Sequence, residues 1–142
     1  MPNIRWLLAL ITAVHRAIYR ASGGRLGGNL LGIRVLLITT TGRRSGRERV
    51  TPLLYVPDEK GFVVVATNAG DERDPSWWLN LRERPDATVQ AGRAVHAVRA
   101  REAAPDEEAV LWPRLLASYG PYARYRDHTK RHIPVVILER VS

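Results

Sequence analysis

The chain has 142 residues, 45% of them hydrophobic, which predicts a single globular unit. It contains no cysteine, which excludes disulfide bonds and thiolate metal sites and favours a reducing compartment, the cytoplasm. The net charge is +8, and residues 1–60 carry ten Arg and Lys against three Asp and Glu, whereas residues 61–142 carry twelve against eleven. This asymmetry predicts that an anionic partner meets the first part of the chain: a membrane surface, a nucleic acid or a phosphorylated small molecule.

Residues 4–21 are predicted to form an amphipathic helix. Its apolar side chains recur at spacings of three and four, namely Leu7, Leu10, Ile11, Val14 and Ile18. The continuous apolar run is only about nine residues long, well short of the roughly 20 that span a bilayer. Together with the glycine-rich residues after it, the helix forms a predicted N-terminal segment, 1–32, ahead of a main domain, 33–142. The helix either packs on that domain or lies on an anionic membrane through Trp6, its neighbours and two arginines, Arg16 and Arg20.

The next part of the chain is predicted to alternate strands with turns. Extended segments rich in β-branched residues cover 33–41, 49–56 and 62–67, separated by a loop at 42–46 and a turn at 57–61. Pro75 favours the first turn of a helix that Pro85 ends. Two further strands, 87–90 and 95–101, are predicted to form a hairpin.

The last part of the chain is predicted to contain two helices and a strand. Pro105 and the three acidic residues after it favour a helix start, and that helix ends near residue 119. Pro113 predicts a kink or a restart within it, and Pro121 opens a short helix to about residue 130. The final strand is 134–138. Closely spaced strands favour an antiparallel α+β sheet or barrel and disfavour a doubly wound fold.

The most informative stretch is residues 39–52, which read TTTGRRSGRERVTP. Gly42 and Gly46 bracket Arg43, Arg44 and Ser45 between two predicted strands, so backbone N–H groups and guanidiniums can converge on one anion such as a phosphate. The spacing matches neither a Walker loop nor a dinucleotide fingerprint. A solvated hairpin tip and a nucleic-acid groove are the alternatives, although the tryptophans are not interleaved with the basic run as stacking platforms would be.

From about Tyr19 to Val141 the sequence resembles the deazaflavin (F420)-dependent nitroreductases, also called F420-dependent quinone reductases. Four motifs carry the resemblance in the family's order and spacing: TTTGRRSGRERVTPL, VVVATNAG, DPSWWLNLRERP and SYGPYARYRDHTKRHIPVVIL. The resemblance implies an FMN-binding split-barrel-like fold of about six antiparallel strands with an N-terminal helix and flanking helices. It further implies that coenzyme F420 (8-hydroxy-5-deazaflavin) binds in a groove of the barrel.

The resemblance also implies roles for individual residues. The basic loop would hold the phosphate and oligoglutamate tail of F420 through Arg43, Arg44, Ser45 and Arg49, with arginine at 44 where the family commonly has lysine. Pro52 would shape the strand beside the deazaflavin ring. The ring would lie along Thr67, Asn68 and Ala69.

Two adjacent tryptophans also bear on the predicted site. Trp77 and Trp78 are adjacent on a predicted helix and point about 100° apart, so they are not expected to share a face. One is expected in the core, and the resemblance makes Trp77 the wall of the groove. Asn80 either contacts the cofactor or serves in capping or packing.

Tyr119, Tyr122 and Tyr125 recur every three residues, and the resemblance places them over the substrate side of the deazaflavin. A plain core stripe is the alternative. A phenol, with a pKa near 10, can donate a hydrogen bond or a proton to a reduced oxygen. His128 and His132 have the spacing of a metal pair, but Pro134 prevents a continuing helix and no carboxylate motif accompanies them, so no metal is expected.

The predicted function is hydride transfer from reduced F420 to a quinone or nitroaromatic, with Tyr122 as first choice for polarising or protonating the acceptor. The alternatives are an FMN- or haem-binding split barrel, a non-catalytic F420 carrier and a basic nucleic-acid-binding module. The expected partner is a small-molecule substrate, and no nucleic acid is expected to bind. The protein is expected to be a cytoplasmic monomer or homodimer, with peripheral membrane contact at the inner face through the N-terminal helix as a further hypothesis.

Overall fold

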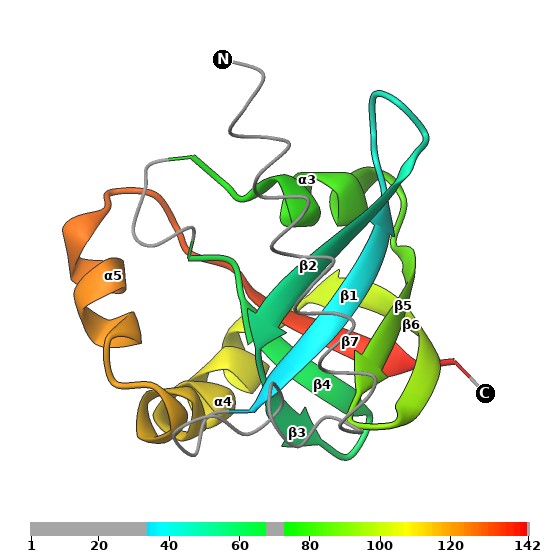
Figure 1. Ribbon diagram of the computed structural model, residues 1–142. Helices are drawn as coiled ribbons and strands as arrows, with labels where there is room; N and C mark the ends of the chain where they lie inside the picture. The colour runs from blue at the N-terminus through cyan, green and yellow to red at the C-terminus, as the bar shows by residue number, and fades with distance from the viewer. Residues whose placement is uncertain (1–33, 68–72, 142) are drawn as a thin grey trace.

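One curled antiparallel sheet forms the centre of the computed structural model, which describes residues 34–67 and 73–141. In these residues seven strands follow the order β2-β1-β5-β6-β7-β4-β3 (Figure 1). The strands are β1 (Val35–Thr41), β2 (Glu48–Leu54), β3 (Val56–Asp58), β4 (Gly61–Val65), β5 (Asp86–Ala91), β6 (Ala94–Glu102) and β7 (Val135–Arg140). The predicted antiparallel α+β architecture is confirmed.

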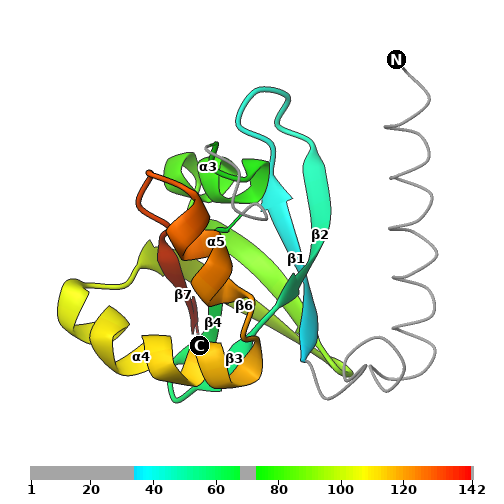
Figure 2. The ribbon, with the colours of Figure 1, turned by 90° about the vertical axis from the view of Figure 1, so that its left-hand side faces the viewer.

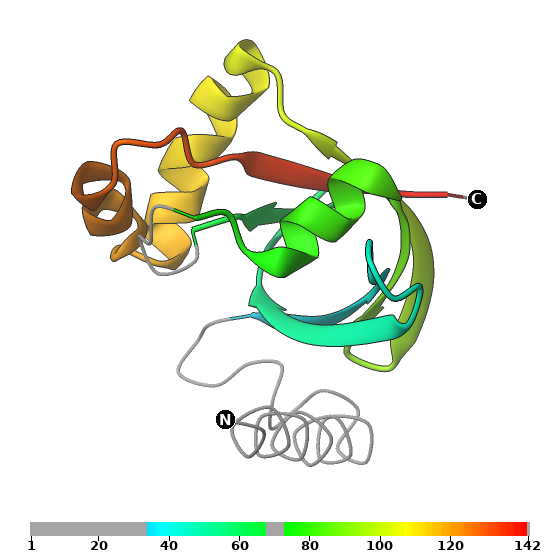
Figure 3. The ribbon, with the colours of Figure 1, turned by 90° about the horizontal axis from the view of Figure 1, so that it is seen from above.

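Three described helices cover two sides of this sheet. Helix α3 (Ser76–Glu83) lies over one end of the curled sheet, beside the loop between β1 and β2 (Figure 3). Helices α4 (Pro105–Ser118) and α5 (Tyr122–His128) lie against the outer side of β4 and β7 (Figure 2). The sheet therefore has an inner core closed by α3 and an outer core closed by α4 and α5.

Strands β4 and β7 are apolar along their length because they contribute to both cores. Phe62 and Val64 of β4 pack in the inner core with α3, whereas Val63 and Val65 pack in the outer core with α4 and α5. Successive side chains of a strand point to opposite faces, so a strand covered on both sides reads as a continuous apolar run. Thr67 therefore follows a strand that is packed on both of its faces.

The predicted strand 49–56 is corrected by the structure to two strands. Strand β2 pairs with β1 and ends at Leu54, and Tyr55 donates its N–H to the Arg34 carbonyl at 3.0 Å. The chain then changes partner, and β3 pairs with β4. The predicted turn 57–61 is accordingly shorter, because Asp58 and Gly61 are already paired. This division gives seven strands where about six were predicted.

The predicted restart at Pro113 is also corrected, because α4 is one continuous helix through that residue, whereas the alternative of a kink stays a prediction. Pro113 cannot donate a hydrogen bond to the carbonyl of Ala109. Both residues are exposed, so water can hydrate that carbonyl. The cost of proline inside a helix is lower at such a position, and the helix continues to Ser118.

The predicted N-terminal helix, the boundary at residue 32 and the proposed membrane contact lie outside the described residues. Within the described residues, no helix is both long and apolar enough to cross a bilayer.

Candidate active site

The loop between β1 and β2 is closed by its own hydrogen bonds. The Gly42 N–H donates to the Arg47 carbonyl at 2.7 Å, and the Gly46 N–H donates to the Gly42 carbonyl at 2.8 Å. Gly46 has a φ of 71°, a left-handed conformation that favours glycine. The Ser45 hydroxyl accepts the Arg47 N–H at 3.2 Å, which leaves the hydroxyl hydrogen able to donate to an anion. The backbone thus presents the arginines from a loop of defined shape.

Asn80 of α3 anchors this loop to the body of the protein. Its Oδ1 accepts the Arg43 N–H at 3.1 Å and the Arg43 guanidinium at 2.9 Å, and its Nδ2 donates to Thr40 Oγ1 at 3.4 Å. Asn80 is 4% exposed and Thr40 is 1% exposed, so these polar groups depend on one another for hydrogen bonds. The Arg43 side chain is therefore directed toward α3, and Asn80 holds the loop in place through these hydrogen bonds.

Two other arginines of the loop, Arg44 and Arg47, are exposed, and so is Arg49 near the start of β2. Arg49 pairs with Thr40 in the β1–β2 register, which places it on the same face of the sheet as Thr40. Pro52 is three residues further along β2, so it lies on the opposite face from Arg49. Arg47 was not predicted from the sequence as a cofactor-binding residue. Its position between Ser45 and Arg49, which were predicted to bind F420, could have indicated it. The resulting cluster of cations suits a ligand with several negative charges.

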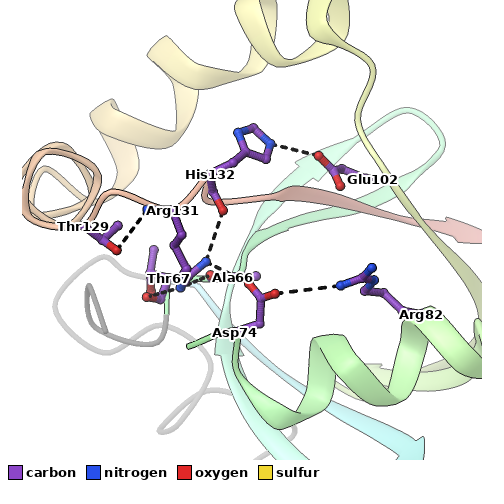
Figure 4. A network of polar contacts seen from close by, with 8 residues as sticks. All are labelled: Ala66, Thr67, Asp74, Arg82, Glu102, Thr129, Arg131 and His132. Carbon is purple, nitrogen blue, oxygen red and sulfur yellow. Dashed lines mark hydrogen bonds and ion pairs between the residues drawn. The ribbon is translucent and has the colours of Figure 1, made fainter. Parts of the chain in front are cut away.

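Thr67 lies two residues beyond the end of β4, and Asn68 and Ala69 lie outside the described residues. The Thr67 carbonyl accepts a hydrogen bond from Arg131 at 2.8 Å, and the same guanidinium forms an ion pair with Asp74 at 2.9 Å (Figure 4). Asp74 lies two residues before the start of α3. Sequence reasoning missed Arg131, whose side chain contacts Ala66, Thr67 and Asp74, 57 to 65 residues away along the chain.

Trp77 and Trp78 both belong to the inner core, which corrects the prediction that they could not share a face. They are 7% and 5% exposed, and their ring centroids lie 6.5 Å apart at 64°. An apolar stripe on a helix is at least about 100° wide, so large adjacent indoles can both reach a core beneath the helix. Trp77 thus offers little exposed surface to a groove.

Tyr119, Tyr122 and Tyr125 come together where α4 meets α5. Tyr122 is 6% exposed, and its ring meets the Tyr119 ring edge-on at 4.9 Å and 71°. The Tyr119 and Tyr125 hydroxyls lie 3.2 Å apart. Burial raises the pKa of Tyr122, and the hydrogen bond to Tyr125 is the main cause of a raised pKa for Tyr119. Both phenols therefore stay protonated to a higher pH than an ordinary phenol, and each O–H can donate a hydrogen bond.

His132 is an exposed residue whose Nε2 lies 2.9 Å from a Glu102 carboxylate oxygen. Among the described residues, no three His, Asp or Glu side chains are grouped as a metal ion would need. A surface hollow of about 720 Å³ lies at the β3–β4 turn, β6 and the end of β7. None of the predicted site residues lines it. Among the described residues, hydrogen bonds join the basic loop to α3 through Asn80 and the end of β4 to Arg131.

Known proteins are similar to this chain in sequence and fold. Residues 12–140 match the model of the F420H(2)-dependent quinone reductase family. The chain belongs to this family. A Mycobacterium tuberculosis relative named F420H(2)-dependent quinone reductase is 36% identical over 148 aligned positions, which cover 99% of both chains. Membership of the family identifies the chain as an oxidoreductase and confirms the resemblance read from its motifs.

Two solved structures of similar sequence support the same assignment. A structure described as an F420-H2-dependent reductase is 39% identical, covers 74% of this chain and 93% of its own, and has a TM-score of 0.68. Another, described as a domain-swapped dimer, is 31% identical, covers 98% of this chain and all of its own, and has a TM-score of 0.72. The curled antiparallel sheet is thus the split barrel of this F420-dependent family.

Proposed function

We propose that the chain binds reduced F420 and catalyses hydride transfer to a quinone or a nitroaromatic compound. The observation that carries this proposal is the loop of exposed arginines, held by Asn80, in a chain of the F420H(2)-dependent family. When bound, reduced F420 supplies two electrons and one hydrogen as a hydride. A quinone that receives the hydride needs one further proton to become a hydroquinone, so a proton donor is required on the protein or in solvent.

The anionic tail of F420 is assigned to the basic loop. Arg44 and Arg49 supply exposed guanidiniums that can bind phosphate and carboxylate oxygens, and the Ser45 hydroxyl can donate beside them. Arg43 contributes charge while its side chain holds the loop against α3. Arg47 is added to this set because it lies in the same loop and is exposed.

The ring is assigned to the end of β4, through Thr67 and the predicted contacts of Asn68 and Ala69. Helix α3 lies between this place and the basic loop, since Asp74 precedes the helix and Asn80 lies within it. Asn80 is the fifth residue of α3 and lies about 6 Å along the helix from its start, so the first part of α3 sets the spacing between tail and ring. Trp77 supports the proposed groove from beneath, and Pro52 shapes β2 from the outer face of that strand.

The acceptor is assigned to the tyrosine cluster, with Tyr122 as the residue that polarises or protonates it. Tyr119 and Tyr125 hydrogen-bond to each other, whereas Tyr122 meets Tyr119 through its ring. Tyr122 is only 6% exposed, and a hydrogen bond that its O–H donates to an acceptor oxygen is stronger where little water competes. Tyr119 and Tyr125 shape the pocket.

The assignment of the cofactor is tested by titrating the purified chain with F420 and with FMN and following fluorescence. We expect saturable F420 binding that weakens as salt is added, because exposed cations are screened, and weak or absent FMN binding. Reduction of a soluble quinone by reduced F420 then distinguishes an enzyme from a carrier. Tight FMN binding without F420 binding would reject the proposal, and steeply salt-dependent nucleic-acid binding without redox activity would favour a nucleic-acid-binding module.

Tyr122→Phe is expected to lower kcat by about 100-fold, the size of effect typical of general acid catalysis, while the Kd for F420 stays unchanged. Tyr125→Phe is the matched control and is expected to have a small effect, since it removes only the partner of Tyr119. The raised pKa of Tyr122 further predicts that kcat does not fall as pH passes 10, the ordinary phenol value. Unchanged turnover in Tyr122→Phe would remove this residue from the mechanism.

A homodimer is the assembly that the domain-swapped neighbour favours. Peripheral membrane contact through the N-terminal helix and a cytoplasmic location stay predictions from the sequence.

A further inference from the structure

Arg131 connects parts of the chain that are far apart in sequence (Figure 4). One terminal nitrogen donates to the carbonyls of Ala66 and Thr67 at 2.9 and 2.8 Å. The other donates to the Asp74 carboxylate at 2.9 Å and to the His132 carbonyl at 3.3 Å. Ala66 and Thr67 precede, and Asp74 follows, the connection from β4 to α3. A single side chain therefore holds both ends of that connection.

The position of Arg131 links these ends to the tyrosines. Arg131 lies three residues after the end of α5, and its N–H donates to the hydroxyl of Thr129, a residue only 8% exposed, at 3.4 Å. Strand β7 begins four residues after Arg131. The carbonyl of Pro134, just before β7, accepts the Ala66 N–H at 3.0 Å. The segment between α5 and β7 is thus joined to the end of β4 by both side-chain and backbone hydrogen bonds.

The chemistry of this junction requires a guanidinium. The Arg131 side chain is 14% exposed and that of Asp74 is 24% exposed, and a charge so far removed from water needs several partners. A guanidinium presents its donors as a planar fork, so it can serve two carbonyls on one side and a carboxylate on the other. A lysine ammonium is a single nitrogen and cannot bridge the same groups in this geometry.

We propose that Arg131 is a positioning residue that sets the ring-binding end of β4 and the start of α3 relative to the tyrosine helix α5. This inference rests on the proposed function, in which Thr67 contacts the deazaflavin ring and the tyrosines contact the acceptor. Reacting groups displaced by about 1 Å can lose about 100-fold in rate. Arg131 would therefore control how closely the two rings approach, without touching either one.

Arg131→Met tests the proposal, because it keeps the aliphatic stem and removes every donor. Measured well below the unfolding temperature, its kcat is expected to fall about 100-fold, with the KM for the quinone changed less than the kcat, and its Kd for F420 is expected to rise. Arg131→Lys keeps the charge and is expected to restore activity only in part. Arg82→Met is the matched control, since Arg82 also faces Asp74, at 3.9 Å, but its side chain is 59% exposed; wild-type values are expected.

Amide hydrogen exchange of the protein without F420 gives a second measurement that does not depend on the cofactor. The Ala66 N–H bonds to the Pro134 carbonyl and the Trp78 N–H bonds to the Pro75 carbonyl, and both amides are expected to exchange faster in Arg131→Met but not in Arg82→Met. If the wild-type protein binds no F420 but this difference in exchange appears, the proposed function is wrong, whereas the role of Arg131 in positioning the end of β4 and the start of α3 is supported. Unchanged exchange together with unchanged kcat and Kd overturns the inference. If Arg131→Met does not fold, Arg131→Lys decides by the same measurements.

Discussion

Asn80→Ala is expected to weaken F420 binding by about tenfold, equivalent to about 1.4 kcal/mol, and to lower the free energy of unfolding by about 1–3 kcal/mol. The substitution removes the acceptor of the Arg43 N–H and of the Arg43 guanidinium. It also leaves the Thr40 hydroxyl, in a residue 1% exposed, without its Asn80 donor. The loop would lose its connection to α3. Binding F420 would then also cost the free energy of ordering the arginines of the loop, which lowers the affinity.

Thr40→Val separates the two effects of Asn80→Ala. Valine has the shape of threonine without the hydroxyl, so this variant removes the Asn80–Thr40 hydrogen bond but leaves both bonds from Arg43 to Asn80. It is expected to lower the free energy of unfolding and to keep the wild-type Kd for F420. Urea denaturation and fluorescence titration measure the two quantities. Equal F420 affinity in Asn80→Ala and wild type would show that anchoring of Arg43 does not matter for binding.

Gly61→Ala is expected to lower the free energy of unfolding by about 3 kcal/mol, or the unfolding temperature by about 10 °C. A Cβ at Gly61 would lie 2.0 Å from the Leu138 carbonyl oxygen, which belongs to the neighbouring strand β7. Strand β4 would have to move away from β7, and both faces of β4 are packed in cores. Because Thr67 follows β4, we also expect weaker F420 binding.

Gly120→Ala is the control for Gly61→Ala. A Cβ at Gly120 would meet nothing within 4 Å, and surface substitutions of this kind usually change stability by less than about 0.5 kcal/mol. Thermal unfolding of both variants measures the difference. Similar unfolding temperatures for the two variants would contradict the close approach of β4 and β7 at this point.

Local patterns in the sequence were sufficient to predict most elements of the fold. The β-branched run before Gly42, the prolines that begin and end α3, and the acidic start of α4 depend on interactions within a few residues, and each was placed within two or three residues of its observed position. The strands at 62–67 and 134–138 were predicted in the same way, and the structure has them as β4 and β7. The charge and glycines of the β1–β2 loop predicted an anion site, and the four linked motifs identified the family and its cofactor.

Only the tertiary structure decided which strands pair and which polar groups meet. The division between β2 and β3 at Tyr55 is a change of partner strand, which no local signal encodes. The tolerance of Pro113 depends on its exposure, and the burial of both tryptophans depends on where α3 lies.

The contacts that organise the site are long-range for the same reason. Asn80 meets Arg43 across 37 residues, and Arg131 meets Thr67 across 64. Such pairs form only when the sheet has brought distant segments together, so the sequence singled out Arg43, Asn80 and Thr67 without predicting these contacts, and it did not single out Arg131. The amino-acid sequence by itself was sufficient for most of the elements, for the proposal of an anion site in the β1–β2 loop and for the family of this protein. The packed sheet determined how that loop, the end of β4 and the tyrosines are held relative to one another, because hydrogen bonds between distant residues need a folded backbone to set their distances.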